Sequence, residues 1–185
     1  MPVATTSGST FLHPENILAK AGLVAGKTVA DLGCGGGYFV LAAARIVGDQ
    51  GLVYGVDILK DALSSVESKA MTFGLSNIKT VWSNVEIFGG ARDIKDNSVD
   101  YVVLAQLLSQ SKNHKAIFKE VLRILKTGGT LIVVDWHKNN LKLGPTNEER
   151  ITVEQAQAIA VANNFILKRE IEAGPYHYGL LFEKK

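Results

Sequence analysis

The sequence predicts an α/β protein, a three-layer αβα, doubly wound fold with a mostly parallel seven-stranded sheet whose last strand is antiparallel. Short apolar runs alternate several times with longer segments of helical period, which is typical of a parallel sheet covered by helices on both faces. The last two apolar runs, 165–171 and 178–182, lie too close in sequence for a crossover helix. We therefore expect these two runs to form an antiparallel hairpin.

The elements can be placed in order along the chain. Strands are expected at 28–32, 52–56, 78–82, 101–104 and 130–134, followed by the two strands of the hairpin. Helices are expected within 11–22 and at 38–46, 61–73, 112–125 and 152–162. Thr152 is a suitable cap for the last of these helices. The polar, glycine-containing segments 84–97 and 137–150 predict loops.

Bulk composition indicates one soluble globular domain over residues 1–185, with residues 1–10 expected to be flexible. Of 185 residues, 46% are hydrophobic and 21% are charged, and the net charge is +2. That charge is too small to indicate nucleic acid or an anionic membrane. The single cysteine excludes an internal disulfide and a cysteine-based zinc site, and we expect no metal. Without a signal-like or membrane-spanning apolar run, we expect a cytoplasmic protein with no membrane partner.

A glycine-rich turn follows the first expected strand. The segment 31–37 reads Asp-Leu-Gly-Cys-Gly-Gly-Gly, and glycines there let the backbone approach a ligand closely. Asp57 ends the second strand, where a carboxylate can accept hydrogen bonds from two ribose hydroxyls. Each feature alone is also compatible with a structural turn. Together they favour a nucleotide-like cofactor, either NAD(P) or S-adenosylmethionine.

Glycine spacing and one carboxylate separate these two cofactors. The glycines Gly33, Gly35 and Gly37 alternate, whereas the dinucleotide fingerprint needs a third glycine at position 38, which is Tyr38. Asp31 just before the turn would repel a pyrophosphate but suits the cationic amino group of a methionine moiety. An NAD(P)-dependent oxidoreductase is therefore the weaker alternative.

Four segments carry a family resemblance. VADLGCGGGYF, VYGVD, NSVDYVVL and EVLRILKTGGTLIVVD occur in this order within residues 11–135. They resemble the motifs of class I, Rossmann-like S-adenosylmethionine-dependent methyltransferases. The style is similar to the type 11 and ubiquinone/menaquinone-biosynthesis methyltransferases. The terminal hairpin agrees with that family's seven-stranded sheet.

The resemblance implies a set of residues that bind the cofactor and its product S-adenosylhomocysteine. These residues are Asp31, Gly33, Cys34, Gly35, Gly37, Asp57, Ile58, Asn84, Val85, Ala105 and Gln106. Asp31 and the glycines would face the methionine part, Asp57 the ribose, and Ile58 the adenine. Asn84 stands where the family often has an aspartate that meets the adenine amino group, and its amide oxygen can still accept. Thr127 stands where relatives usually have proline.

The acceptor side of the reaction is much less defined. Methyl transfer from a sulfonium is a direct displacement, so a general base is optional. His137, Tyr176 and His177 are the candidates at the expected carboxyl edge of the sheet. For His137, the favoured interpretation is an exposed loop residue rather than a base. For Trp136, a packing role is favoured over contact with the substrate. The acceptor itself is unidentified, with a small molecule favoured over RNA or protein.

Other interpretations concern partners. Lys112, Lys115, Lys119, Arg123 and Lys126 lie at helical spacing and form a basic stripe. The stripe indicates a solvated helix face, with RNA or an acidic partner as the alternative. Because the chain is close to a minimal family core, a second copy forming a homodimer is a further hypothesis for the missing wall of the substrate site. A non-catalytic methyltransferase-like module is the remaining alternative.

Overall fold

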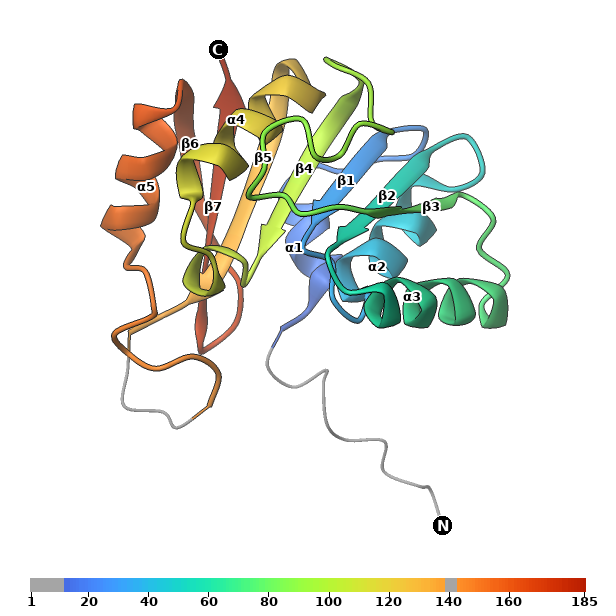
Figure 1. The fold of residues 1–185 in the computed structure, drawn as a ribbon, viewed down its shortest axis with the longest axis horizontal. Coiled ribbons are helices and arrows are strands. Elements are labelled where there is room, and N and C mark those ends of the chain that lie inside the picture. Colours follow the sequence, from blue (N-terminus) through green and yellow to red (C-terminus); the bar gives the residue numbers. More distant parts are fainter. Residues whose placement is uncertain (1–11, 139–142) are drawn as a thin grey trace.

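A computed structural model describes residues 12–138 and 143–185. Its single sheet has seven strands in the order β3-β2-β1-β4-β5-β7-β6 (Figure 1). The strands are β1 Thr28–Leu32, β2 Leu52–Asp57, β3 Ile78–Trp82, β4 Val99–Ala105, β5 Leu125–Trp136, β6 Phe165–Glu172 and β7 His177–Lys184. Strands β1 to β5 pair in parallel, and β7 runs antiparallel to both β5 and β6. The expected α/β class and terminal hairpin are therefore confirmed.

Helices cover both faces of the sheet and give three layers. They are α1 Pro14–Lys20, α2 Tyr38–Val47, α3 Lys60–Thr72, α4 His114–Ile124 and α5 Val153–Ala162, with a 3-10 turn at Leu108–Gln110. Side chains alternate along a strand, so Val103 of β4 packs with α1, α2 and α3 while Val102 and Leu104 pack with α4 and α5. The two hydrophobic clusters on either face of the sheet form the core.

The helix predicted at 112–125 is shorter in the structure, and the fifth strand is longer. Asn113 caps α4 by accepting a hydrogen bond from the N–H of Ala116 at 3.2 Å, so the helix begins at His114. Leu125 already pairs with Val99, so β5 begins there rather than at residue 130. Thr152 caps α5 as expected, in a reciprocal capping box with Gln155.

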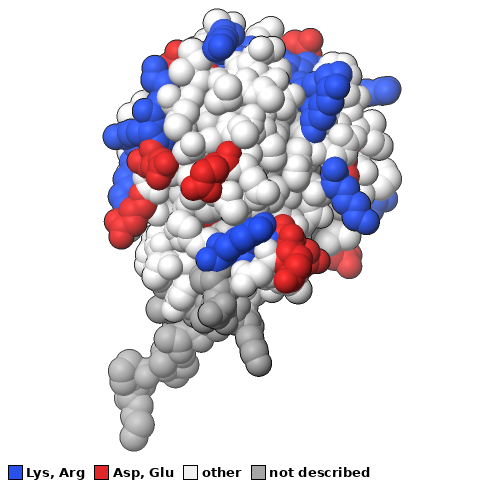
Figure 2. All heavy atoms as spheres, turned by 90° about the vertical axis from the view of Figure 1, so that its left-hand side faces the viewer, with Lys and Arg blue, Asp and Glu red and all other residues white. Residues whose placement is uncertain are grey.

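The basic stripe is not a continuous solvated face. The guanidinium of Arg123 lies 2.6 Å from the buried carboxylate of Glu120 and 2.6 Å from Asp96, and Lys126 pairs with Asp100 at 2.9 Å. Two of the five basic side chains are thus engaged in holding neighbouring segments. Figure 2 shows the face that carries α5 and β6, where basic and acidic side chains are interspersed.

The sheet topology decides where a ligand can bind. Strand order reverses between β1 and β4, and ligands of open α/β sheets bind at the carboxyl edge beside such a switch point. Strands β1, β2, β4 and β5 all end there, and antiparallel β7 begins there. Among the described residues, no helix is long and apolar enough to cross a membrane.

Candidate active site

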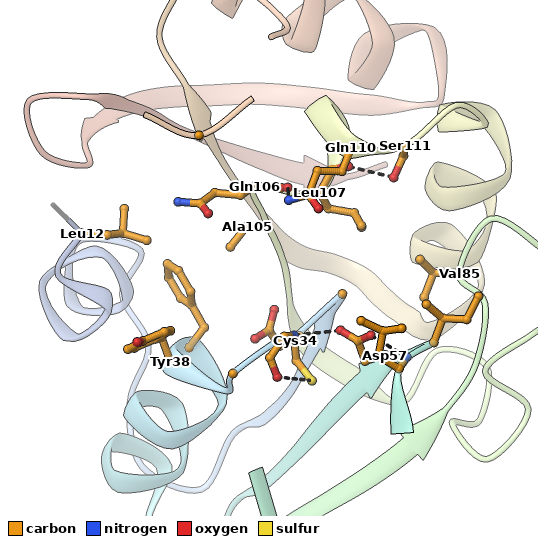
Figure 3. A pocket seen from close by; sticks show the side chains of 18 of the residues that line it. Leu12, Cys34, Tyr38, Asp57, Val85, Ala105, Gln106, Leu107, Gln110 and Ser111 are labelled. Atoms are coloured by element: carbon orange, nitrogen blue, oxygen red, sulfur yellow. Dashed lines mark hydrogen bonds between the residues drawn. The ribbon is translucent and has the colours of Figure 1, made fainter. Parts of the chain in front are cut away.

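A cavity of about 840 Å³ opens at this carboxyl edge. Its volume lies in the upper part of the range of about 300–1,000 Å³ typical of pockets that enclose a small molecule. In Figure 3, Asp57 and Val85 lie on one side of Cys34, and Tyr38 and Leu12 lie on the other. We call the part of the cavity lined by Asp57, Ile58, Asn84 and Val85 the Asp57 end, and the part lined by Gln106, Trp136 and His177 the Gln106 end.

The glycine turn forms the floor of the cavity between the two ends. The N–H groups of Gly33 and Cys34 donate to the carbonyl of Val56 at 2.8 and 2.9 Å, which ties the turn to β2. Gly33 and Gly35 have φ values of +76° and +48°, a region that favours glycine. A Cβ on Gly35 would meet no atom within 4 Å, so the backbone at this position is open to a ligand.

Asp57 at the end of β2 links the second motif to the first. Its Oδ2 accepts from the N–H of Gly35 at 2.8 Å, and its Oδ1 accepts from the N–H of Leu59 at 2.9 Å. A carboxylate oxygen has two lone pairs, so each oxygen keeps capacity for one more donor. The side chain lines the cavity, as expected for a residue that receives two vicinal hydroxyls.

Asp31 on β1 is the most unusual group in the cavity. The residue is 2% exposed, and its Oδ1 has no hydrogen-bond partner among the described residues. Burial, and then the nearby charge of Asp57, raise the pKa of Asp31 from 3.8 to about 7. A buried carboxylate without a partner is costly, and a cationic ligand group would compensate that cost.

The Asp57 end also holds the residues expected around an adenine. Ile58 is 54% exposed and Val85 is buried, and both line the cavity. The Oδ1 of Asn84 accepts from the N–H of Glu86 at 2.9 Å, forming a local turn. That oxygen therefore already has one donor, and a ligand amino group would have to share it.

At the other end, Ala105 is the last residue of β4 and Gln106 directly follows it, so both lie at the carboxyl end of this strand. Trp136 at the end of β5 pairs in register with His177 at the start of β7, and their rings lie 4.1 Å apart. The Nε2 of Gln106 lies 2.8 Å from the Nε2 of His177, which is 1% exposed. Gln106, Trp136 and His177 therefore form one wall of the cavity.

Some sequence-predicted residues lie elsewhere. His137 is exposed and packs edge-on against Tyr178 at 5.6 Å, and neither His137 nor Tyr176 lines the cavity. Gly37, which precedes α2, does not line the cavity either. It lies against Val66 of α3 instead. Cys34 lines the cavity and is buried, and burial raises the pKa of its thiol. Of the three catalytic candidates, only His177 reaches the site.

Several lining residues were not identified from the sequence. They are Leu12, Pro14, Gly36, Tyr38, Phe39, Leu59, Ser83, Glu86, Leu107, Gln110, Ser111, Leu143 and Gly144. Some of them directly follow a strand that ends at the carboxyl edge, and that position could have pointed to them. Leu143 and Gly144 carried no such signal, because only the tertiary structure brings their loop against Trp136. No group of possible metal ligands occurs among the described residues.

Comparison with known proteins supplies the family. The model of a family described as "Methyltransferase domain" matches residues 23–174. The chain belongs to this methyltransferase family. Its seven-stranded sheet and its ordered motifs place it in the class I, type 11 group that the sequence indicated.

Relatives of this methyltransferase-family chain include proteins named demethylmenaquinone methyltransferase. A demethylmenaquinone methyltransferase of Geobacillus kaustophilus is 30% identical over 121 residues, which are 65% of this chain and 50% of the relative. The chain thus spans about half the length of the curated relatives it matches. A solved S-adenosylmethionine-dependent methyltransferase from Aquifex aeolicus is 26% identical, with a TM-score of 0.85 over 94% of this chain and 90% of that one. The [4+2]-cyclase SpnF shares the fold, at 17% identity and a TM-score of 0.77, over 92% of this chain and 80% of SpnF.

Proposed function

We propose that this protein transfers a methyl group from S-adenosylmethionine to a small-molecule acceptor. The observation that carries the proposal is Asp31, a buried carboxylate whose Oδ1 is without a partner among the described residues and which lines the cavity. The α-amino group of a methionine moiety is a cation of the right size and chemistry to pair with it. The family and the Aquifex aeolicus relative support the same cofactor.

The residues present fit this cofactor along the cavity floor. Asp31 would hold the amino group, the turn at Gly33 and Gly35 would lie against the methionine part, and Asp57 would receive the ribose hydroxyls. Ile58 and Val85 would enclose the adenine, with Asn84 at its polar edge. When bound, S-adenosylmethionine supplies a methyl group on a positively charged sulfur. This chain's own contribution is to bind, to orient both partners and to exclude water.

The same carboxylates argue against a dinucleotide. A pyrophosphate on the glycine turn would lie close to both Asp31 and Asp57, and the charge of Asp57 already raises the pKa of Asp31. The fold alone does not define the reaction, because the [4+2]-cyclase SpnF shares it. The proposed reaction therefore rests on the residues of the site.

For the acceptor, a fused-ring hydroquinone is the candidate that the demethylmenaquinone methyltransferase relatives favour. A cavity of about 840 Å³ whose Gln106 end is lined by Trp136 and Gly144 has room for a small ring, which favours a small molecule over an RNA or protein chain. A homodimer that completes this wall stays a separate proposal, and sedimentation at several protein concentrations tests it.

The activity test uses a defined acceptor. Purified protein is incubated with S-adenosylmethionine and 1,4-naphthoquinol under reducing conditions, and products are followed by mass spectrometry. We expect S-adenosylhomocysteine and a product heavier by one methylene, both dependent on Asp57. Cofactor binding without any methylated product would contradict the quinol acceptor, and absence of cofactor binding would contradict the methyltransferase proposal itself.

A further inference from the structure

Gln106, which lines the cavity, has an unusual backbone conformation. Its φ is +55°, one of three positive values among the described non-glycine residues. Such a conformation is strained for a residue with a side chain and persists only where neighbouring contacts impose it. Here the N–H of Gln106 donates to the carbonyl of Val134 at 2.7 Å, and its carbonyl accepts from the side chain of Gln110 at 2.8 Å. The backbone is therefore fixed so that the side chain enters the cavity (Figure 3).

The side-chain amide of Gln106 is fixed as well. With the amide nitrogen of Gln106 as the donor, the 2.8 Å contact requires the Nε2 of His177 to accept, which is the tautomer that carries its ring proton on Nδ1. His177 is buried and held in register by Trp136, so it presents a rigid acceptor. The amide oxygen of Gln106 then has no hydrogen-bond partner among the described residues. In Figure 3 the side chain extends toward the side of the cavity where Leu12 lies.

The charges around the cavity restrict what can meet this oxygen. Three carboxylates, those of Asp31, Asp57 and Glu86, line it, and no lysine or arginine of residues 12–138 and 143–185 does so. A carboxylate or phosphate on the acceptor would find repulsion and no counter-ion among these lining residues. An uncharged group that donates a hydrogen bond would instead find the amide oxygen of Gln106.

We propose that Gln106 determines acceptor specificity, because its amide oxygen receives an O–H or N–H of an uncharged acceptor. His177 is the positioning residue that keeps the amide in this orientation. This inference rests on the proposed function, since it concerns the second substrate of the same site. The family resemblance places Gln106 among the cofactor residues, and this proposal assigns its amide oxygen to the acceptor instead.

The test compares three probes of similar shape on protein saturated with S-adenosylhomocysteine. 1-Naphthol donates a hydrogen bond, 1-methoxynaphthalene does not, and 1-naphthoate carries a negative charge. Binding is measured by calorimetry. We expect 1-naphthol to bind roughly tenfold more tightly than 1-methoxynaphthalene, the ratio that about 1.4 kcal/mol of hydrogen bonding gives. We expect 1-naphthoate to bind most weakly of the three.

Variants separate the two roles. Gln106→Leu should abolish the preference for 1-naphthol. His177→Phe keeps a ring but cannot accept from the amide, so the preference should fall. His177→Gln offers an oxygen near the place of Nε2 and should restore it. Nitrogen NMR of the wild-type imidazole should find the proton on Nδ1. Because the two His177 variants and the NMR signal are independent of Gln106→Leu, a folding failure of that variant leaves the test intact.

Each outcome has one meaning. Equal binding of 1-naphthol and 1-methoxynaphthalene, or no binding of either, would overturn the role of Gln106. The role of Gln106 would also be overturned if Gln106→Leu still preferred 1-naphthol over 1-methoxynaphthalene, or if 1-naphthoate bound most tightly. An imidazole of His177 with its proton on Nε2 would overturn it as well. A folded protein that does not bind S-adenosylhomocysteine would instead overturn the proposed function on which this inference rests.

Discussion

The backbone N–H of Gly35 donates to the Oδ2 of Asp57 at 2.8 Å, which joins the glycine turn after β1 to the end of β2. The two motifs that are separate in sequence therefore form one unit. The carboxylate holds the turn in shape before any ligand arrives and retains lone pairs toward the cavity. Binding and local structure are coupled at this residue.

Asp57→Asn tests that coupling. An asparagine oxygen can accept from only one of the two N–H groups now bound, and the amide nitrogen would face the other. With a hydrogen bond to a charged group worth about 1.5–3 kcal/mol, S-adenosylhomocysteine affinity should fall by about tenfold to 100-fold. Calorimetric titration measures this affinity. The control is Asp61→Asn, which removes an exposed carboxylate in the first turn of α3. Equal affinities of the two variants would contradict the account.

Asp31 predicts a pH dependence of cofactor affinity. Burial and Asp57 raise the pKa of Asp31 to about 7, so its carboxyl is protonated in the free protein at lower pH. A cationic amino group binds the ionised form, so binding must release a proton below about pH 7. Affinity for S-adenosylhomocysteine should fall by up to about tenfold for each pH unit below that value.

The measurement is calorimetry between about pH 5.5 and about pH 7 in buffers of different ionisation enthalpy, which reports the released proton directly. Asp31→Asn is the matched variant, since it cannot ionise. It should bind weakly at every pH with no proton release. A wild-type affinity that does not change with pH, or a dependence retained in Asp31→Asn, would argue against this role.

Gly33→Ala tests the shape of the turn. The new Cβ would lie 2.8 Å from the Cδ1 of Leu107, and the φ of +76° is unfavourable for alanine. We expect a loss of about 1–3 kcal/mol in unfolding free energy and weaker cofactor binding, because Leu107 also lines the cavity. Gly74→Ala is the control, with φ +65° and no atom within 4 Å of the new Cβ. Its stability loss should come without a change in S-adenosylhomocysteine affinity, and an unimpaired Gly33→Ala would refute the argument.

Glu120 supports the loop beside the Asp57 end. Its buried carboxylate pairs with Arg123 and accepts from the N–H groups of Gly89 and Ala91 at 2.7 and 3.2 Å. Glu120→Ala leaves a partly buried guanidinium and two N–H groups without this partner. Urea unfolding should show a loss of about 3–5 kcal/mol, with a smaller loss in Glu120→Gln. Lys119→Ala, on the exposed side of α4, should change stability by less than about 0.5 kcal/mol. Wild-type stability of Glu120→Ala would count against a supporting role.

Local sequence patterns were enough to predict much of the fold and most residues of the Asp57 end. The glycines at 33 and 35, the strand that precedes them and Asp57 at the next strand end are close in sequence, and their spacing has one simple structural meaning. The hairpin was predictable because the segment before His177 is too short for a helix. Such features depend on few neighbours, so they can be read before the tertiary structure is known.

The Gln106 end could not be predicted in the same way. The contact of Gln106 with His177 joins residues 71 positions apart, and it depends on the register that pairs Trp136 with His177. From the sequence, His137 and His177 are equally good candidates for a catalytic base. In the structure, His177 is buried in the antiparallel strand pair, whereas His137 is exposed. Likewise, the burial of Arg123 beside Glu120 distinguishes it from the solvated lysines of its stripe only in three dimensions.

The central claim is that the cavity binds S-adenosylmethionine. The most direct measurement is a calorimetric titration of the folded protein with S-adenosylmethionine and S-adenosylhomocysteine, with NAD as the comparison. The account predicts micromolar binding of both adenosyl ligands and no detectable binding of NAD. Folded protein that binds neither adenosyl ligand, or that prefers NAD, would contradict it.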